Sequence, residues 1–348
     1  MTRFLAVLTV RNEAAFLLEW LAHHQAVGFT DFLVFSNDCD DGTDLLLDQL
    51  QDHGQLTHIR NDGPHEGGVQ WSALKQADKH PLVKQADWIM TLDVDEFVNI
   101  HTGDHTLSAL VNGLPEASAI TLTWRLFGNN GVERYQDEPI TTQFTAAAPA
   151  IMNWPWRASM FKTLYKNDGT YRKIGVHRPR SPDQSRVDQA RWFDCCSREL
   201  GERFKRQQIF SPFGRENYQL AQLNHYPLGA MESYLVKRDR GRAVHDADQL
   251  GMSYWVERNW NTETDTSIST QAARSSAARA KLDTLSGLSD LHQAGVDWRR
   301  AKFDSLMQLE PYRALFGRLL MTPPSVPINQ EAARILYQYA QRANPRQD

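Results

Sequence analysis

The sequence predicts an α/β protein in which helices cover both faces of a mostly parallel sheet, followed by a mainly helical C-terminal region. Over the first hundred residues, short aliphatic and aromatic runs alternate with segments of helical periodicity. The connections between them are short and polar, which is typical of strand–helix–strand repeats. From Met231 onward, helical periodicity dominates. These three observations carry the fold-class prediction.

The first half of the predicted sheet consists of four strands separated by helices. The strand-like runs are residues 4–10, 32–35, 56–60 and 87–92. Apolar residues recur at helical spacing in residues 13–27, 43–53 and 70–85. Gly28 and Gly54 fit helix ends, and we expect Pro81 to break the third helix.

The rest of the chain divides into a mixed part and a helical part. Residues 119–124 and 160–165 are predicted strands, and residues 181–217 are predicted to be loop-rich. Prolines at positions 323, 324 and 327 indicate a linker before the last helix. The clearest helices of the C-terminal part are expected at residues 231–242, 269–285 and 331–342.

Composition excludes several classes of protein. The formal net charge of -4 argues against a general nucleic-acid binder. The three cysteines, Cys39, Cys195 and Cys196, suit neither a disulfide framework nor a zinc site. The apolar N-terminus is too short for a signal peptide, and no run approaches the ~20 residues of a membrane span. We therefore expect a cytoplasmic protein with reduced thiols and no transmembrane segment.

Two acidic residues, Asp93 and Asp95, directly follow the fourth predicted strand. Alternate residues of an extended backbone project to the same side, so the two charges repel unless something positive lies between them. A divalent cation is the usual solution, because hard cations take carboxylate oxygens. A cation that also carries a diphosphate would indicate activated phosphate esters as ligands.

The turns after the strands at residues 10, 35 and 92 are expected to share one edge of the sheet. In mostly parallel sheets, ligands bind at the carboxyl ends of the strands. Polar side chains that follow these strands should therefore gather at one place. They are Arg11, Asn12, Glu13, Asn37, Asp38, Asp93 and Asp95.

Several motifs resemble those of known glycosyltransferases. Residues 9–13 (Thr-Val-Arg-Asn-Glu) and 40–43 (Asp-Asp-Gly-Thr) resemble the opening motif and the acidic turn of family 2 glycosyltransferases. Residues 93–97 (Asp-Val-Asp-Glu-Phe) resemble the metal motif of GT-A glycosyltransferases. A closer resemblance, over about the first two thirds of the chain, is to a subgroup that includes family 92. Its further marks are residues 87–88, 127–131, 176–177, 224–226 and 233–238.

The resemblance implies a GT-A fold with a Rossmann-like sheet. Residues 1–240 would form the glycosyltransferase domain, and residues 241–348 a helical extension. The nucleotide-sugar half would span about residues 1–100 and the acceptor half about 101–240. We expect a metal-dependent, hexosyltransferase-like enzyme of polysaccharide biosynthesis that transfers a sugar with inversion. Its partners would be a nucleoside-diphosphate sugar and a glycan or lipid-linked sugar acceptor, in the cytoplasm or at the inner face of the membrane.

The resemblance also implies a metal site. Asp93 and Asp95 would hold Mn²⁺ or Mg²⁺ between the two phosphates of the donor. His225 would complete the site, with His177 as the alternative. An imidazole ligand favours Mn²⁺ over Mg²⁺.

Residues that bind the donor are expected at the strand ends and on the helix after His225. An alternative for residues 38–41 is a helix cap, which Asp41 or Thr43 would serve without a ligand. For the cationic helix, the alternative is a solvated face. The predicted donor-binding residues are Val10, Arg11, Asn12, Glu13, Asn37, Asp38, Lys237 and Arg238.

An inverting transferase needs a carboxylate that takes the proton of the acceptor hydroxyl. Glu133 and Asp137 are the candidates, with Glu138 and Asp183 in the same variable middle region. Glu96 is set aside because a continuing strand would direct its side chain away from Asp93 and Asp95.

Two other functions remain open. A nucleotidyltransferase also combines a nucleotide-binding sheet with paired acids, but it normally has a Gly-rich basic loop where this chain has Arg11-Asn12-Glu13. A binding protein without turnover would keep the same residues, so only turnover with an acceptor separates it from an enzyme.

Overall fold

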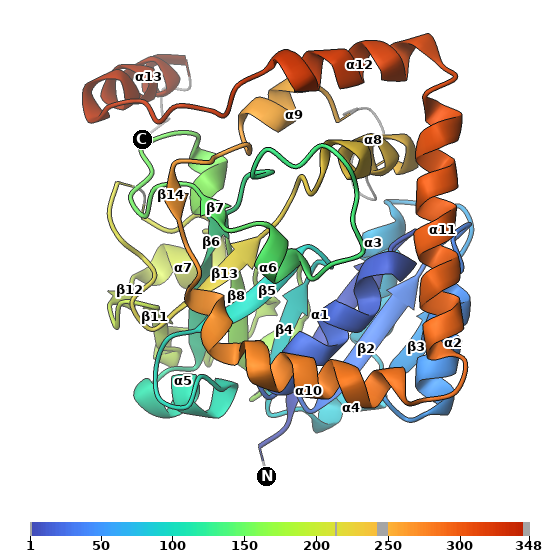
Figure 1. Ribbon diagram of the computed structural model, residues 1–348. Coiled ribbons are helices and arrows are strands. Elements are labelled where there is room, and N and C mark those ends of the chain that lie inside the picture. The colour runs from blue at the N-terminus through green and yellow to red at the C-terminus, as the bar shows by residue number, and fades with distance from the viewer. Residues whose placement is uncertain (1, 213, 242–249, 344–348) are drawn as a thin grey trace.

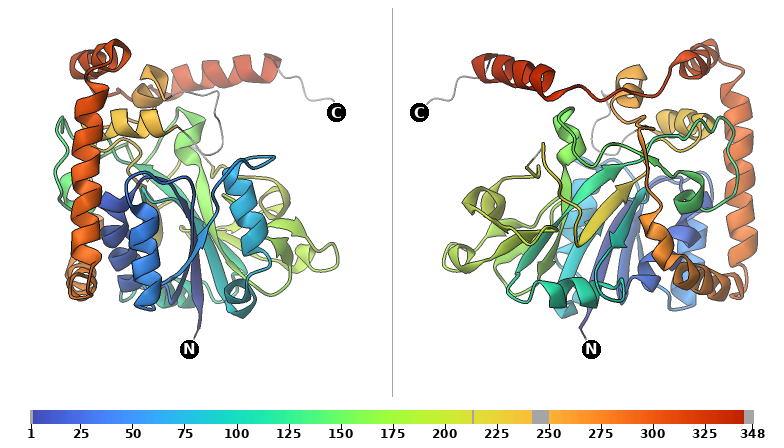
Figure 2. Two further views of the ribbon diagram at one scale, coloured as in Figure 1. Left: turned by 90° about the vertical axis from the view of Figure 1, so that its right-hand side faces the viewer. Right: turned by 60° about the vertical axis from the view of Figure 1, so that its left-hand side comes forward.

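The computed structural model describes residues 2–212, 214–241 and 250–343. A twisted central sheet lies between helices, and the C-terminal helices run along one side of it and across one end (Figures 1 and 2). The described part thus has the predicted α/β architecture with a helical C-terminal region.

The parallel half of the sheet is built from four N-terminal strands with buried aliphatic side chains. They are β1 (Phe4–Val10), β2 (Asp31–Ser36), β3 (Thr57–Arg60) and β4 (Trp88–Leu92). β1 pairs in parallel with β2 and β4, and β2 pairs in parallel with β3. All four strands therefore end at one edge of the sheet, as predicted.

Helices cover both faces of this half because alternate strand residues point to opposite faces. Leu8 belongs to a core shared with the first two helices, and Leu5 belongs to a core on the other face. Pro81 splits the predicted helix over residues 70–85 into two, since proline is tolerated in the first turn of a new helix. The helices are α1 (Ala14–Ala26) and α2 (Thr43–Asp52) on one face, and α3 (Val69–Ala77) and α4 (Pro81–Gln85) on the other.

The second half of the sheet is mixed. Its strands are β5 (Glu96–Ile100), β6 (Ala119–Leu126), β8 (Phe161–Lys166), β11 (Trp192–Asp194), β12 (Glu199–Leu200) and β13 (Ala221–His225). β8 lies antiparallel between β4 and β6, which gives the order β12-β11-β6-β8-β4-β1-β2-β3. β13 pairs with β5 and β6 and places His225 opposite Glu96.

Short elements surround the sheet. Among them, β7 pairs with β14 and β9 pairs with β10, each as a two-stranded antiparallel ribbon. The short strands are β7 (Ala146–Ala147), β9 (Tyr171–Lys173), β10 (Arg180–Pro182) and β14 (Glu263–Thr264). The short helices are α5 (Leu107–Gly113), α6 (Ile140–Gln143), α7 (Glu202–Arg206) and the 3₁₀ turns Trp156–Ser159, Val187–Gln189 and Ser267–Gln271.

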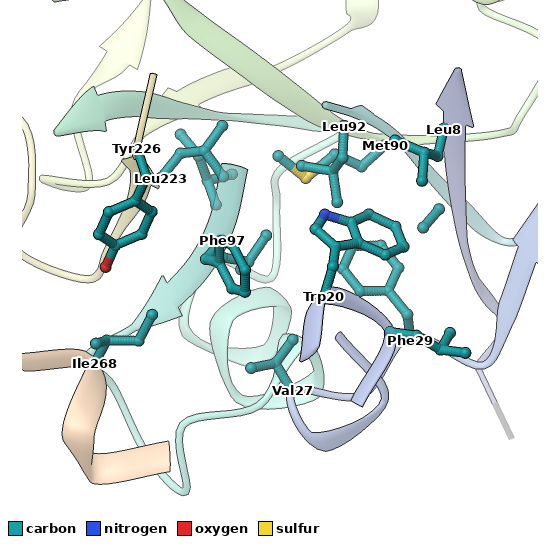
Figure 3. Packing of buried hydrophobic residues seen from close by; sticks show 14 of the residues in the cluster. Leu8, Trp20, Val27, Phe29, Met90, Leu92, Phe97, Leu223, Tyr226 and Ile268 are labelled. Atoms are coloured by element: carbon teal, nitrogen blue, oxygen red, sulfur yellow. The ribbon is translucent and has the colours of Figure 1, made fainter. Parts of the chain in front are cut away.

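The core reaches directly to the turn between β4 and β5. Trp20 of α1 lies among the buried side chains of these strands, near Leu92 and Phe97 (Figure 3). Its indole nitrogen donates to the carbonyl oxygens of Asp93 and Glu96, each at 3.1 Å. Apolar packing of α1 therefore fixes the backbone of the acidic turn.

The C-terminal helices share cores with the sheet and its helices. Leu282 and Leu288 belong to the same core as α1, and a further core surrounds Trp255. The 19-residue helix α11 and helix α12 lie in the region predicted to be mainly helical, but not in its three clearest predicted segments. Residue 242 of the predicted helix 231–242 lies outside the described residues. The elements are α8 (Met231–Arg240), α9 (Met252–Val256), α10 (Ala272–Asp283), α11 (Leu288–Leu306), α12 (Glu310–Met321) and α13 (Gln330–Ala343).

Within the described ranges, no helix combines the length and the apolar character that crossing a membrane requires. The division at residue 240 stays a proposal, because the helices after it pack against α1 and α2.

Candidate functional site

The acidic motif lies in a turn and not on a continuing strand. β4 ends at Leu92 and β5 begins at Glu96, so the carboxylates of Asp93 and Asp95 do not project from one extended backbone. The prediction that both carboxylates project to the same side of one strand is therefore wrong. Each acid instead meets its own lysine, which removes the repulsion that two neighbouring carboxylates would suffer.

Asp93 is held by a buried pair, Lys162 and Glu96. The ammonium nitrogen of Lys162 lies 2.9 Å from Asp93 Oδ2 and 3.5 Å from Glu96 Oε2. Glu96 Oε2 also accepts the backbone N–H of Asp93 at 2.8 Å. Burial raises the pKa of Glu96 to about 8, although Lys162 opposes this shift. Burial would lower the pKa of Lys162, but the negative charges of Asp93 and Glu96 raise it.

Asp95 is held by Lys237 of α8. The lysine nitrogen lies 2.6 Å from Asp95 Oδ2 and donates to the carbonyl oxygen of Pro227 at 2.8 Å. Burial would raise the pKa of Asp95, but the charge of Lys237 outweighs it and holds that pKa well below its usual range. His225 Nε2 is 3.7 Å from the same Asp95 oxygen, and burial lowers the pKa of His225. The imidazole of His225 is therefore neutral at neutral pH and able to bind a cation.

Trp124 of β6 connects the surroundings of the two acids. Its indole nitrogen donates to Glu96 Oε1 at 2.6 Å, and its ring centroid lies 4.3 Å from that of His225. The His177 ring is 5.7 Å from Trp124 on another side. His177 Nδ1 donates to the carbonyl oxygen of Phe161 at 3.0 Å, and burial lowers the pKa of His177 to about 4.

The protein groups at the acidic turn fit a cation bound by two ligands. Among the residues that the structure describes, no group of three or more His, Cys, Asp or Glu side chains is arranged to hold a metal ion. Asp95 Oδ2 and His225 Nε2, 3.7 Å apart, suit two ligands of one ion, with the other positions left to phosphate oxygens and water. Such an ion would compete with Lys237 for Asp95 Oδ2.

The turn after β1 is tied to two other segments. Asn12 has a positive φ of 52°, and its side-chain oxygen accepts the backbone N–H of Asp40 at 2.8 Å. Glu13 forms an ion pair with Arg240 of α8. The Arg240 guanidinium also donates to the carbonyl oxygen of Arg11 at 2.7 Å. Asn12 and Glu13 thus position this turn, while Val10 and Arg11 remain available to a ligand.

The turn after β2 combines a structural part and a ligand-accessible part. Asp41 accepts the backbone N–H groups of Ala14 and Thr43, both at 2.9 Å, at the starts of α1 and α2, although the N-cap residue of α2 is Gly42. The side-chain oxygen of Asn37 is buried without a hydrogen-bond partner among the described residues. Asp38 Oδ1 accepts the backbone N–H of Gly63 at 3.1 Å.

A cleft of about 1170 Å³ lies at the carboxyl ends of β1, β2 and β4. It brings together most of the predicted site residues. Those that line it are Val10, Arg11, Glu13, Asn37, Asp38, Asp93, Asp95, His177, His225 and Lys237.

The model of glycosyltransferase family 92 matches residues 6–187, which is more than half of the chain. The chain belongs to glycosyltransferase family 92. A family 92 protein of Oryza sativa subsp. japonica is 26% identical over 149 residues, 40% of this chain and 24% of the relative. A family 92 protein of Ricinus communis is 24% identical over 143 residues, 39% of this chain and 25% of the relative. The chain thus spans about a quarter of the length of these relatives.

Solved structures resemble this family 92 chain only in part. S. aureus TarS has a TM-score of 0.32 at 14% identity, covering 65% of this chain and 37% of TarS. A complex of glucosyl-3-phosphoglycerate synthase from Mycobacterium tuberculosis with Mn²⁺ and UDP has a TM-score of 0.24 at 16% identity, covering 36% of this chain and 44% of the synthase. These likenesses carry no argument about function.

Several predicted residues of the family 92 chain lie away from the cleft. Arg238 donates to the carbonyl oxygen of Leu250. Glu133 is exposed, and the carboxylate of Asp137 lies 3.1 Å from His292 Nε2 on α11. The structure therefore does not bring either candidate base to Asp93 and Asp95.

The two further candidate bases are also accounted for. Glu138 lines a separate cavity of about 50 Å³ that also touches Asp95. Asp183 forms an ion pair with Arg172 at 2.7 Å.

Lys162 and Trp124 are the site residues that sequence reasoning missed. Lys162 lies in the predicted strand 160–165, where a lysine is ordinarily assigned to the solvent face. Trp124 is buried in the core, and its indole also binds Glu96. A lysine within a strand that otherwise carries mostly apolar and aromatic side chains was the available signal.

Proposed function

We propose that this chain transfers a sugar from a nucleoside-diphosphate sugar to a hydroxyl group, with inversion and with a divalent cation held by Asp95 and His225. One observation carries the proposal: Asp95, His225 and Lys237 converge at the carboxyl edge of the sheet, within a large cleft. Membership of family 92 supports the transfer of a sugar.

The reaction exchanges one bond for another at the anomeric carbon. The acceptor oxygen forms a bond to this carbon, the bond to the diphosphate oxygen breaks, and the nucleoside diphosphate leaves with the electron pair. The acceptor proton passes to a base. Lys237 and Arg240 line the cleft beside Asp95 and Glu13, and ammonium and guanidinium groups bind phosphate oxygens well.

A divalent cation at Asp95 and His225 would neutralise the charge that grows on the leaving diphosphate. The imidazole ligand favours Mn²⁺ over Mg²⁺. Asp93 would bind this cation directly or through water, since its Oδ2 lies 2.9 Å from Lys162 much as Asp95 Oδ2 lies 2.6 Å from Lys237.

The nucleoside is proposed to lie at the ends of β1 and β2. Val10, Arg11, Asn37 and Asp38 line this part of the cleft. The unpartnered side-chain oxygen of buried Asn37 suits a donor group of the nucleoside, because a buried acceptor without a partner is costly.

The proposal is tested by thermal unfolding of the full chain with a panel of nucleoside diphosphates, with and without Mn²⁺. We expect one nucleotide to stabilise the chain only together with Mn²⁺, by about 2.7 kcal/mol at a hundredfold excess over Kd. Asp95→Asn and His225→Ala should each remove the Mn²⁺ dependence and lower turnover about hundredfold or more.

Asp290→Asn is the matched control, because Asp290 is an exposed carboxylate in the first turn of α11. It should leave nucleotide binding unchanged. The cation assignment would be wrong if Asp95→Asn retained the Mn²⁺-dependent stabilisation of the parent chain.

Nucleotidyl transfer has less support. The turn after β1 has Asn12 bound to Asp40 and Glu13 bound to Arg240 in place of a Gly-rich phosphate loop. Release of pyrophosphate from a nucleoside triphosphate and a sugar phosphate would revive it. Nucleotide binding without turnover over a broad acceptor panel would instead favour a binding protein.

A further inference from the structure

The part of the cleft lining that comes from residue 124 onward is strongly cationic. All four carboxylates among the described cleft residues belong to the first 95 residues, namely Glu13, Asp38, Asp93 and Asp95. From Trp124 onward, the described lining contains six arginines and one lysine, and no Asp or Glu. Lys237 and Arg240 belong to the donor end. We call the remaining five, Arg157, Arg178, Arg180, Arg206 and Arg258, the arginine wall.

Arg180 of β10 is held without a direct ion pair among the described residues, and Asp78 is near enough only for a longer-range interaction. Its Nε donates to the carbonyl oxygen of Ile174 at 3.0 Å, and its guanidinium lies 4.3 Å from the ring centroid of Trp71. No carboxylate of the described residues lies within ion-pair distance of Arg180. A guanidinium stacked on an aromatic ring is pre-organised and keeps N–H groups for a ligand.

Arg178 also has no carboxylate partner among the described residues, although it is only 9% exposed. It donates to the carbonyl oxygen of Lys205, and its Nε has no hydrogen-bond partner. Burial lowers its pKa, because a buried charge without a counter-ion is costly. A nearby anionic ligand would supply the missing counter-charge.

The other three arginines have carboxylate partners. Arg157 and Arg258 share one carboxylate, Glu257, at 3.7 and 3.4 Å. Arg206 pairs with Asp188 at 2.6 Å and with Glu202 at 3.8 Å, and its side chain is 39% exposed. The wall therefore keeps a net positive charge within a protein whose formal net charge is -4.

We propose that the acceptor is an anionic saccharide, which carries a phosphate or a carboxylate that binds the arginine wall. This inference rests on the proposed transferase function. At the proposed donor end, Lys237 and Arg240 lie beside Asp95 and Glu13, where they and a cation would bind the diphosphate, so the arginine wall is left for the second substrate. Charge-assisted bonds from guanidinium groups suit both anions. Five arginines in the lining of one cleft argue for an anionic ligand.

Calorimetric titration of the full chain tests this proposal. The probes are D-glucose 6-phosphate and D-glucuronate, with D-glucose as the neutral match. Each is titrated into the chain alone, and into the chain saturated with Mn²⁺ and the nucleoside diphosphate that stabilises it. We expect either anionic sugar, or both, to bind at least about tenfold more tightly than glucose under both conditions. The stronger of the two identifies the phosphate or the carboxylate as the recognised group.

Arg180→Gln and Arg206→Gln should each weaken binding of the anionic sugar about tenfold. Arg172→Gln is the matched control, because Arg172 lies on the neighbouring strand β9, is 68% exposed and is outside the cleft. It should change nothing. Thermal unfolding verifies that each variant is folded.

Three results would overturn the inference. Glucose could bind as tightly as the anionic sugars, the anionic sugars could fail to bind, or they could compete with the nucleotide for one site. Nucleotide binding with Mn²⁺ should persist in Arg180→Gln. If the unsubstituted chain bound no nucleotide with Mn²⁺, that result would instead contradict the proposed transferase function.

Discussion

At the scale of single residues, the unusual group is Lys162. Its side chain is fully buried, and it lies between the carboxylates of Asp93 and Glu96. Glu96 in turn binds the indole of Trp124, which stacks on His225. The buried ammonium group of Lys162 therefore helps to orient the groups that we assign to the donor site.

Lys162→Met should destabilise the chain by about 3 kcal/mol, because removing one partner of a buried ion pair leaves the other uncompensated. The substitution should also reduce turnover, because Asp93 loses the ammonium group that orients its carboxylate. Urea unfolding and the rate of donor hydrolysis measure the two effects.

Above pH 8, where Glu96 is ionised, Glu96→Gln combined with Lys162→Met should recover part of that stability, since it removes the uncompensated carboxylate. A coupling of about 1–3 kcal/mol between the two sites is expected. Strictly additive effects of the two substitutions would contradict the buried pair.

Sequence reasoning predicted the acids but not their lysine partners. Asp93 and Asp95 follow an apolar strand, so their place at the sheet edge follows from local pattern. Lys162 and Lys237 reach them from positions 69 and 142 residues away in the chain, and no local pattern encodes such a contact. The exposure of Glu133 and the pairing of Asp137 with His292 depend on tertiary structure in the same way.

At the scale of elements, α1 is joined to β5 by two neutral histidines. His23 Nε2 donates to the carbonyl oxygen of Val98 at 2.8 Å. His24 Nδ1 donates to the carbonyl oxygen of Trp20 at 2.8 Å, and its Nε2 accepts the N–H of Val98 at 3.4 Å. Burial lowers the pKa of His23 from 6.5 to about 4, and that of His24 well below its usual value.

Stability should therefore fall as the pH decreases from 6.5 towards 4. In that window the unfolded chain binds protons at these histidines and the folded chain does not, so protonation favours unfolding. His23 alone accounts for about 3 kcal/mol at the acid end. Free energies of unfolding measured across this range should show a smaller pH slope for His23→Gln.

His53→Gln is the control, because His53 directly follows α2, is only half-buried, and has a ring that contacts Gln49 and the carbonyl oxygen of Ser286. The free energy of unfolding of His53→Gln should change with pH as steeply as that of the parent chain. An unchanged slope in His23→Gln would show that His23 is not buried neutral between α1 and β5.

Element prediction succeeded where one face is uniformly apolar and failed where it is not. The alternation of strands and helices in residues 4–92 is confirmed because β1, β2 and β4 are short, mostly apolar runs, although β3 is not. Helix α11 has no clean apolar stripe, since its buried positions include His292, Gly295 and Arg299. Its amphipathic pattern is therefore hidden from periodicity.

At the scale of the whole molecule, the C-terminal helices are packed onto the α/β unit. Gly295 of α11 lies so close to α1 that an added Cβ would be 2.5 Å from the Cβ of Ala14. Gly317 of α12 has nothing within 4 Å of such an atom. The two glycines therefore differ in environment although both are helical.

Gly295→Ala should destabilise the chain by about 1–3 kcal/mol, because the methyl group overpacks the contact with α1. Gly317→Ala should stabilise it by about 0.5–1 kcal/mol through helix propensity. The two variants are compared by denaturant midpoints at constant m-value. Equal stabilisation of both would show that α11 does not pack on α1.

The strand β13 also sets an order of events during synthesis. It pairs with β5 across more than a hundred residues, and the N–H of Tyr226 donates to the carbonyl oxygen of Asp95 at 2.8 Å. A nascent chain that has emerged only to residue 187 already contains Asp95 but lacks His225 and Lys237. Such a chain lacks part of the proposed donor site, which is completed only after β13 has been synthesised and has paired with β5.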